Sequence, residues 1–209
     1  MRALVLAFVL VLLGPTGSSA QDRERQTRAA ELSALAHRFA EAGDRVSARA
    51  YYRDAISADP SYADAYVALG ELELGRDAYR DAEATFRVGL VRAGSDARLW
   101  IGLARALTGL GAPDDADSVL AQADAQLPDD LALLAFRAEH AEQRGRWSLA
   151  LSITRRLAEI AARDADHDRE DALRARARAL ELLVGELDPV RSAPSAASRV
   201  RRLLASPRR

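Results

Sequence analysis

The chain has no cysteine and no lysine, and only 5% of its residues are aromatic. Without cysteine, disulfide scaffolds and thiolate metal sites are excluded. All 30 basic side chains are arginine, against 31 acidic ones, and alanine supplies 45 of the 209 residues. Alanine, leucine and arginine favour helix over sheet. Because 49% of the residues are hydrophobic and the net charge is near zero, the chain can bury a core, so we do not expect disorder throughout.

The first twenty residues have the pattern of a secretory signal peptide. Arg2 places a positive charge before the apolar run Ala3–Leu13, and the small residues Ser18 and Ala20 follow. This order predicts a signal peptide with cleavage between Ala20 and Gln21. We therefore expect an exported protein, either periplasmic or secreted.

An uncleaved membrane anchor is the less favoured alternative for this segment. Eleven apolar residues span about 16 Å as a helix, roughly half of a bilayer core. No cysteine follows the run, which excludes the lipid attachment of a lipoprotein, and no second long apolar run occurs. The mature chain is therefore predicted to contain no transmembrane segment.

From Ala29 onward the sequence repeats with a period of 34 residues. Apolar residues recur at spacings of three and four, which predicts two helices in each row. Gly43, Gly111 and Gly145 mark the turn between them, and in the second row Gly75 is expected to do so. One helix pair cannot bury its apolar face alone, so neighbouring pairs are expected to stack. Three columns carry the repeat: Leu32, Tyr66, Trp100 and Leu134; Ala48, Ala82, Ala116 and Ala150; Tyr52, Phe86, Leu120 and Thr154.

This pattern closely resembles the tetratricopeptide repeat family over residues 29–162. The resemblance depends on two runs in each row, which in the first row are Leu32, Leu35, Ala36 and Phe39, then Ala48, Tyr52, Ala55 and Pro60. The fourth row departs from the pattern at Arg137, Thr154 and Ala162. The resemblance implies antiparallel helix pairs stacked into a right-handed superhelix with a concave inner surface.

The predicted fold class is therefore all-α, an α-solenoid of about four stacked helix pairs with a C-terminal capping helix. Leu173, Ala177, Leu180, Val184 and Leu187 form the apolar stripe of that last helix. The predicted organisation is a signal peptide at 1–20, a lead-in at 21–28, repeats at 29–164 (29–62, 63–96, 97–130 and 131–164), a capping helix at 165–188 and a flexible basic tail at 189–209.

Charge is divided unevenly along the chain. Residues 21–190 carry 23 arginines and 31 acidic residues, whereas residues 191–209 carry six arginines and no acid. The tail is suited to weak contact with anionic lipid or an acidic partner, although a solvated tail is the favoured interpretation. Nucleic-acid binding is not expected, because the body of the protein is acidic.

No pattern in the chain predicts catalysis, a metal site or a cofactor. The three histidines, at 37, 140 and 167, include no pair at the helical spacing of a zinc site. The cluster Asp166, His167 and Asp168 is best explained as a solvated loop. No nucleophile elbow and no phosphate-binding glycine loop is present. The chain is therefore not expected to be an enzyme.

The resemblance implies that side chains of the first helix of each pair line a concave groove that binds a partner. Arg98 and Arg105 lie two helical turns apart and share a face. They are expected either to pair with acids of neighbouring helices or to accept a carboxylate from the partner. The groove residues so predicted are His37, Glu41, Asp64, Val67, Glu71, Arg98, Ile101, Arg105, Glu139 and Glu142.

These expectations favour a non-catalytic protein–protein interaction module or scaffold that binds a peptide or a partner helix of unknown identity. Two alternatives stay open. The chain could be an accessory subunit of an envelope enzyme, or a structural repeat that associates with itself through an exposed edge.

Overall fold

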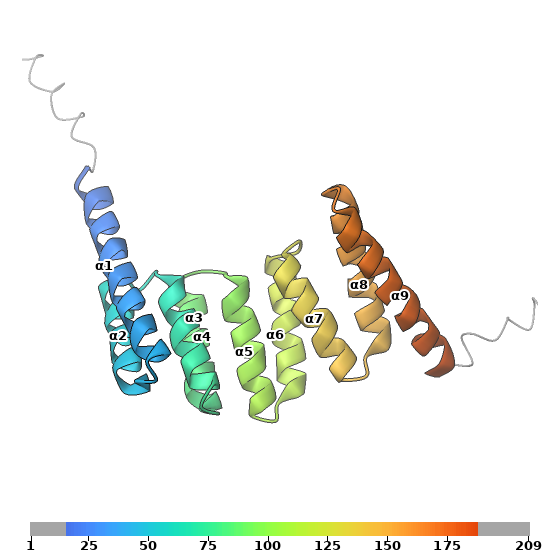
Figure 1. Ribbon diagram of the computed structural model, residues 1–209, viewed down its shortest axis with the longest axis horizontal. Coiled ribbons are helices and arrows are strands. Elements are labelled where there is room, and N and C mark those ends of the chain that lie inside the picture. Colours follow the sequence, from blue (N-terminus) through green and yellow to red (C-terminus); the bar gives the residue numbers. More distant parts are fainter. Residues whose placement is uncertain (1–15, 188–209) are drawn as a thin grey trace, which may run out of the picture. The chain divides into compact units, whose positions relative to one another are not determined.

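The computed structural model describes residues 16–187, which form nine α-helices and no strand (Figure 1). The all-α prediction is confirmed. The chain divides into two compact units, residues 1–126 and 127–209, each taken by itself below. Residues 1–15 and 188–209 lie outside the described residues, and they include most of the predicted signal peptide and all of the predicted tail.

The first unit consists of three helix pairs. Each helix packs against the next one along the chain, and the first helices of neighbouring pairs also contact each other, α1 with α3 and α3 with α5. This arrangement places α1, α3 and α5 on a common side of the unit. The helices are α1 (Thr16–Glu41), α2 (Arg45–Ala58), α3 (Ala63–Leu74), α4 (Tyr79–Arg92), α5 (Ala97–Gly109) and α6 (Pro113–Gln126).

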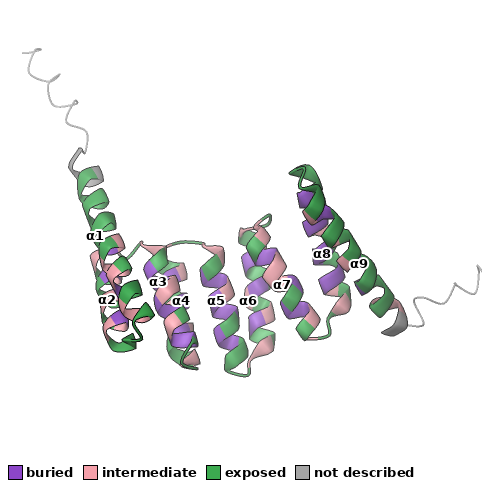
Figure 2. Cartoon of the chain, viewed as in Figure 1, coloured by how far each residue is buried: buried purple, intermediate pink, exposed green. Residues whose placement is uncertain are grey.

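The repeating columns are the buried core of the pairs (Figure 2). All four alanines of the second column, Ala48, Ala82, Ala116 and Ala150, are fully buried. The large column is buried as well, from Tyr52 at 3% exposed to Phe86 at 0%. Both of these columns are thus buried in all four rows.

Phe86 on α4 shows why small residues recur where neighbouring pairs meet. Its ring lies against Gly70 of α3 and Gly102 of α5, and a Cβ on either glycine would fall inside the ring's van der Waals radius. Glycine is therefore the only residue that admits the ring on both sides without a shift.

The turn of the second pair corrects one sequence expectation. Gly75, predicted to make this turn, is right-handed with φ −65°. Asp77 instead takes the left-handed conformation, with φ +57°, as Gly43 and Gly111 do with φ +81° and +75°. Asp77 lies 34 residues from each of these glycines. The 34-residue period therefore predicts the left-handed turn residue of this pair better than the presence of a glycine does. The Tyr79 hydroxyl donates a 2.5 Å hydrogen bond to the Asp77 carboxylate.

The second unit pairs α7 (Leu131–Gln143) with α8 (Trp147–Arg163) and packs α9 (His167–Leu187) against α8. One cluster joins all three helices through Ala141, Leu151 and Leu180, among others. Helix α9 lies within residues 165–188, the segment for which a capping helix was predicted. Helix α8 runs past Ala162, where earlier rows have Pro60 or Pro128, because nothing there stops the helix.

Helix α1 begins well before the first repeat. It spans 26 residues, and residues 21–28, the predicted N-terminal lead-in, belong to this helix with their side chains exposed. Only from Ala29, which is fully buried, does α1 join the core. Within residues 16–187, no helix has both the length and the apolar character to cross a bilayer.

Candidate interaction surface

Eight of the ten predicted groove residues lie on the first helices of the first unit. His37 and Glu41 lie on α1, and the other six on α3 and α5. These six form three cross-helix positions, each 34 residues apart, which we call the α3–α5 seam. The seam comprises Asp64 with Arg98, Val67 with Ile101, and Glu71 with Arg105.

Ion pairs occupy both ends of the seam. Arg98 Nη2 lies 2.7 Å from Asp64 Oδ1, and Arg105 Nη1 lies 2.5 Å from Glu71 Oε1. Val67 and Ile101, both half-buried, take the middle position. Of the two roles expected for the arginines, the structure shows internal pairing. The resulting surface is a small aliphatic centre between two cross-helix salt bridges.

Arg98 is shared between two carboxylates. Its Nη2 also lies 2.7 Å from Asp96 Oδ2, and Asp96 caps α5 by accepting a hydrogen bond from the Arg98 backbone N–H. The hydrogen bond from the guanidinium lowers the pKa of Asp96, and the same bond raises the pKa of Arg98. Both groups are therefore firmly charged, and Arg98 has little capacity left for a ligand carboxylate.

The remaining predicted residues lie apart from the seam. His37 and Glu41 form their own pair on α1, with His37 Nε2 3.4 Å from Glu41 Oε1. Glu139 and Glu142 belong to α7 in the other unit. Glu142 accepts a 2.9 Å hydrogen bond from Arg176 of α9, again 34 residues away. The structure therefore joins six of the ten residues in one surface.

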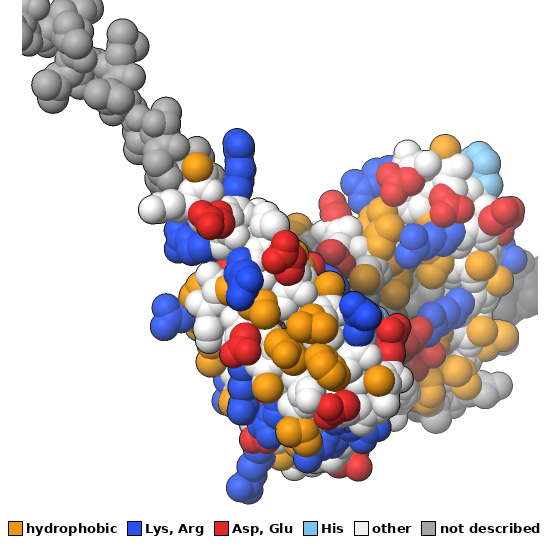
Figure 3. All heavy atoms as spheres, turned by 60° about the vertical axis from the view of Figure 1, so that its left-hand side comes forward, with side chains coloured by type: hydrophobic (Ala, Val, Ile, Leu, Met, Phe, Trp, Pro, Cys, Tyr) orange, Lys and Arg blue, Asp and Glu red, His pale blue; other side chains and the backbone are white. Residues whose placement is uncertain are grey.

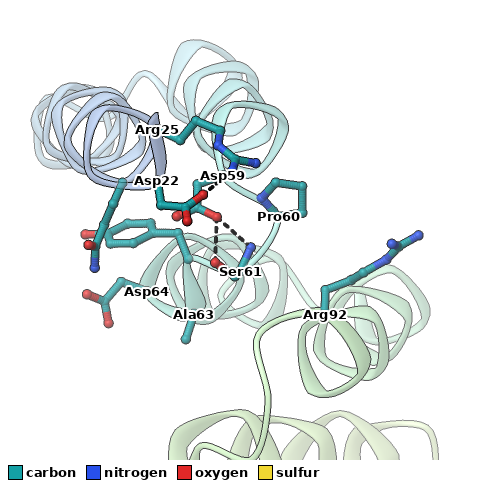
Figure 4. A pocket seen from close by; sticks show the side chains of 10 residues that line it. Asp22, Arg25, Asp59, Pro60, Ser61, Ala63, Asp64 and Arg92 are labelled. Atoms are coloured by element: carbon teal, nitrogen blue, oxygen red, sulfur yellow. Dashed lines mark hydrogen bonds and ion pairs between the residues drawn. The ribbon is translucent and has the colours of Figure 1, made fainter. Parts of the chain in front are cut away.

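A polar pocket of about 760 Å³ adjoins the seam at Asp64 (Figure 4). It lies between the start of α1, the α2–α3 loop and the end of α4. Asp59 organises the loop by accepting hydrogen bonds from the backbone N–H and the hydroxyl of Ser61. The sequence did not predict this pocket, because Asp22 and Arg25 precede the first repeat and therefore have no position in the 34-residue pattern. Its lining is Asp22, Arg25, Gln26, Asp59, Pro60, Ser61, Tyr62, Ala63, Asp64 and Arg92.

A buried ionic cluster between α2, α3 and α4 was also missed. Glu73 is 2% exposed, although its column holds apolar residues in the other rows. It accepts hydrogen bonds from Arg49 Nη2 at 3.3 Å and Thr85 Oγ1 at 2.7 Å, and Arg49 also contacts Asp81 at 3.1 Å. These contacts satisfy the buried carboxylate, so the cluster serves packing rather than binding.

Hydrophobic side chains gather on the side of the first unit formed by α1 and α2 (Figure 3). The rings of Phe39 and Tyr51 stack there with centroids 5.2 Å apart and planes 5° from parallel. Leu32 and Leu35 are only half-buried, whereas Tyr66 and Leu69, one repeat later, are buried. The described chain places no helix pair before α1, which accounts for this exposed edge.

No group of three or more histidine or acidic residues within the described range could hold a metal ion. The geometry thus offers paired charges, an aliphatic centre and an open polar pocket. Such a surface can bind a chain that carries both charged and apolar groups.

Comparison with known families agrees with this architecture. A sequence model of the tetratricopeptide repeat matches residues 39–107, which run from the end of α1 into α5. This stretch of the chain therefore matches the tetratricopeptide repeat. The match includes all six seam residues, so the seam is built from tetratricopeptide-repeat helices. No curated protein matches the chain.

Three solved structures share the fold, and two of them are described as tetratricopeptide repeat proteins. A thermophilic one from Thermus thermophilus is 23% identical, with 77% of this chain and 84% of that one covered and a TM-score of 0.56. MamA (41-end) from Desulfovibrio magneticus RS-1 is 16% identical, with coverages of 67% and 79% and a TM-score of 0.52. A tetratricopeptide repeat protein from Parabacteroides merdae ATCC 43184 is 18% identical, with coverages of 78% and 69% and a TM-score of 0.51. At these identities the likeness concerns the fold alone.

Proposed function

We propose that this protein is a non-catalytic interaction module that binds a peptide or a partner helix on the α3–α5 seam. The observation that carries the proposal is the seam itself. Its aliphatic centre, Val67 and Ile101, lies between two half-exposed salt bridges on the side shared by the first helices. An apolar contact surrounded by polar groups is the usual anatomy of a protein interface.

The salt bridges suit recognition better than stability. The side chains of Arg105 and Glu71 are 46% and 43% exposed, and those of Arg98 and Asp64 are 54% and 50% exposed. Exposed pairs of this kind contribute at most about 1 kcal/mol each to folding. A partner can therefore rearrange these salt bridges at a small cost in free energy, while its own charges determine how it aligns along the seam.

Site-specific photo-crosslinking tests this proposal. A photoreactive residue at Ile101 should give a discrete cross-linked product in the compartment where the protein resides. The same residue at Val88, a 48% exposed aliphatic on the second helix α4, is the matched control and should give none. Equal amounts of cross-linked product at the two positions, or a product at Val88 alone, would contradict the proposal that the seam is the interaction surface.

We also propose that the protein works outside the cytoplasm. The support is the order of charge, apolar run and small residues in 1–20, which is typical of a cleaved signal peptide. Mass spectrometry of the protein from fractionated cells should find Gln21 as the first residue. A protein that retains Met1 and stays with the membrane would instead favour the uncleaved anchor.

A further inference from the structure

The apolar side chains that gather over α1 and α2 form an outer edge of the first unit (Figure 3). We call Leu32, Leu35, Phe39 and Tyr51 the α1–α2 edge. All four side chains are half-buried, and Phe39 stacks on Tyr51. The residues that follow Leu32 and Leu35 by one repeat are buried instead. The edge thus has the composition of an internal face of the stack, and an exposed apolar patch of this kind marks an interaction surface.

Two charged residues of opposite sign lie beside Leu35 on α1. Glu31 precedes Leu35 by four residues and Arg38 follows it by three, so all three share one face over two helical turns. Both charged side chains are exposed, and within residues 16–187 neither has an ion-pair partner. The arginines of the seam, in contrast, are already paired. Glu31 and Arg38 can therefore bind charges of another molecule without losing an ion pair of their own.

The order of these two charges along α1 is complementary to its own reverse. In a two-fold symmetric contact, residue i of one copy meets residue j of the other, and j meets i. When two α1 helices cross antiparallel with the axis beside Leu35, Glu31 of each copy faces Arg38 of the other, and two ion pairs form. In a parallel arrangement Glu31 would face Glu31 and Arg38 would face Arg38, and these like charges repel. The charge pattern thus favours an antiparallel second copy over a parallel one.

The wider surroundings of the edge are nearly neutral. Residues 21–58 contain seven arginines and six acids. Four charged or titratable side chains of α1 pair within their own copy, Arg25 with Asp22 and His37 with Glu41. Glu24 and Arg28, toward the start of the face that carries Glu31, again have opposite signs. Two copies can therefore approach each other without net repulsion.

We propose that the α1–α2 edge binds a second copy of this protein, with the two α1 helices antiparallel about a two-fold axis beside Leu35. The apolar side chains of the two edges then cover each other, and a Glu31–Arg38 ion pair lies on either side of the axis. Such a contact is isologous, so it closes into a dimer and does not continue into a fibre. The edge contains no seam residue, so this inference does not depend on the function proposed above.

Sedimentation equilibrium of the purified full chain tests whether the protein associates in this way. Over an about hundredfold range of concentration it should shift from monomer to dimer by mass action, with no larger species. Glu31→Arg and Arg38→Glu should each weaken the dimer by about tenfold, because like charges then meet twice across the axis. Both variants change exposed side chains, and circular dichroism checks that they are folded.

Mixing these two variants is the sharpest measurement. One variant then supplies arginine at both positions and the other supplies glutamate at both, so each contact between positions 31 and 38 again joins opposite charges. The mixture should form heterodimers with an affinity close to that of the unaltered protein. The double variant Glu31→Arg with Arg38→Glu exchanges the two charges and should also recover the dimer.

A matched control separates position from net charge. Asp115→Arg makes the same change of charge as Glu31→Arg at an exposed site on α6, and it should dimerise as the unaltered protein does. A protein that stays monomeric over the whole range would overturn the proposal and leave the edge to a different partner. A dimer that both charge reversals leave intact, equal weakening by Asp115→Arg, or single variants that fail to associate when mixed would overturn it as well.

Discussion

The second and fourth helix pairs fill one column position in opposite ways. Phe86 on α4 and Thr154 on α8 are both fully buried. The Phe86 ring fills two slots that glycines leave open. Thr154 has a hydroxyl with no hydrogen-bond partner, and bulk in its region comes from Leu134, Ile153 and Leu157. The repeat backbone thus fixes which positions are buried, and the neighbouring residues adapt to the side chain found there.

This difference makes the two units unequal in how tightly they specify their packing. Around Phe86 the packing depends on one large ring and on the two glycines, Gly70 and Gly102, that leave room for it. A change to the ring or to either glycine should therefore destabilise the protein. At Thr154 a buried polar group is unsatisfied, so the site should tolerate, and even gain from, substitution.

Removing the ring should have the largest effect. Phe86→Ala is expected to lower the free energy of unfolding by about 3–5 kcal/mol, because it leaves a cavity between α3, α4 and α5. Chemical denaturation followed by circular dichroism measures the change. If Phe86→Ala lowered the free energy of unfolding by less than the exposed control Val88→Ala, the close packing of this ring between Gly70 and Gly102 would be contradicted.

Adding a Cβ at one of the two glycines beside Phe86 should destabilise the protein less than removal of the ring. Gly102→Ala is expected to destabilise by about 1–3 kcal/mol through overpacking, although alanine favours helix. Gly185→Ala, with open space around its α9 position, should instead stabilise by up to about 1 kcal/mol. Adding Phe86→Leu should recover part of the Gly102→Ala loss; purely additive effects would show that the two sites do not compete for space.

In the fourth pair the expected effect is a gain. Thr154→Val replaces the unsatisfied hydroxyl with a methyl group of similar size and should stabilise by about 1–2 kcal/mol. Thr154→Ser keeps the hydroxyl and loses the methyl group, so it should destabilise. The two melting curves should move in opposite directions, and a destabilised valine variant would show that the hydroxyl has a partner.

The smallest effect concerns the turn after α8. Ala165 has φ +57°, a left-handed conformation that strains alanine. Ala165→Gly should therefore stabilise by about 0.5–1 kcal/mol, even after the added freedom of the unfolded chain is counted. Gly145→Ala, at φ +68° in the preceding turn, is the reciprocal control and should destabilise by a similar amount.

The helical class, the 34-residue period and most of the core positions follow from the amino-acid sequence. Each column of 34-residue spacing meets the same backbone environment in every pair, so even Thr154, which breaks the chemical pattern, is buried where the register predicts. The first-helix positions of the seam followed from the same periodicity and from the family resemblance. The turn at Asp77 could have been predicted in this way too, since the period pointed there.

The pairing of charged side chains, in contrast, depends on how the helices pack in three dimensions. Arg98 contacts two carboxylates from different places, one on α3 and one at its own helix cap. Glu73 is a buried acid because Arg49 and Thr85 reach it from α2 and α4. The pocket beside Asp64 needs the extended α1 and a loop to meet. Periodicity fixes which face a side chain occupies, but partners depend on the distance between helices and on the reach of long flexible side chains, which one-dimensional spacing does not contain.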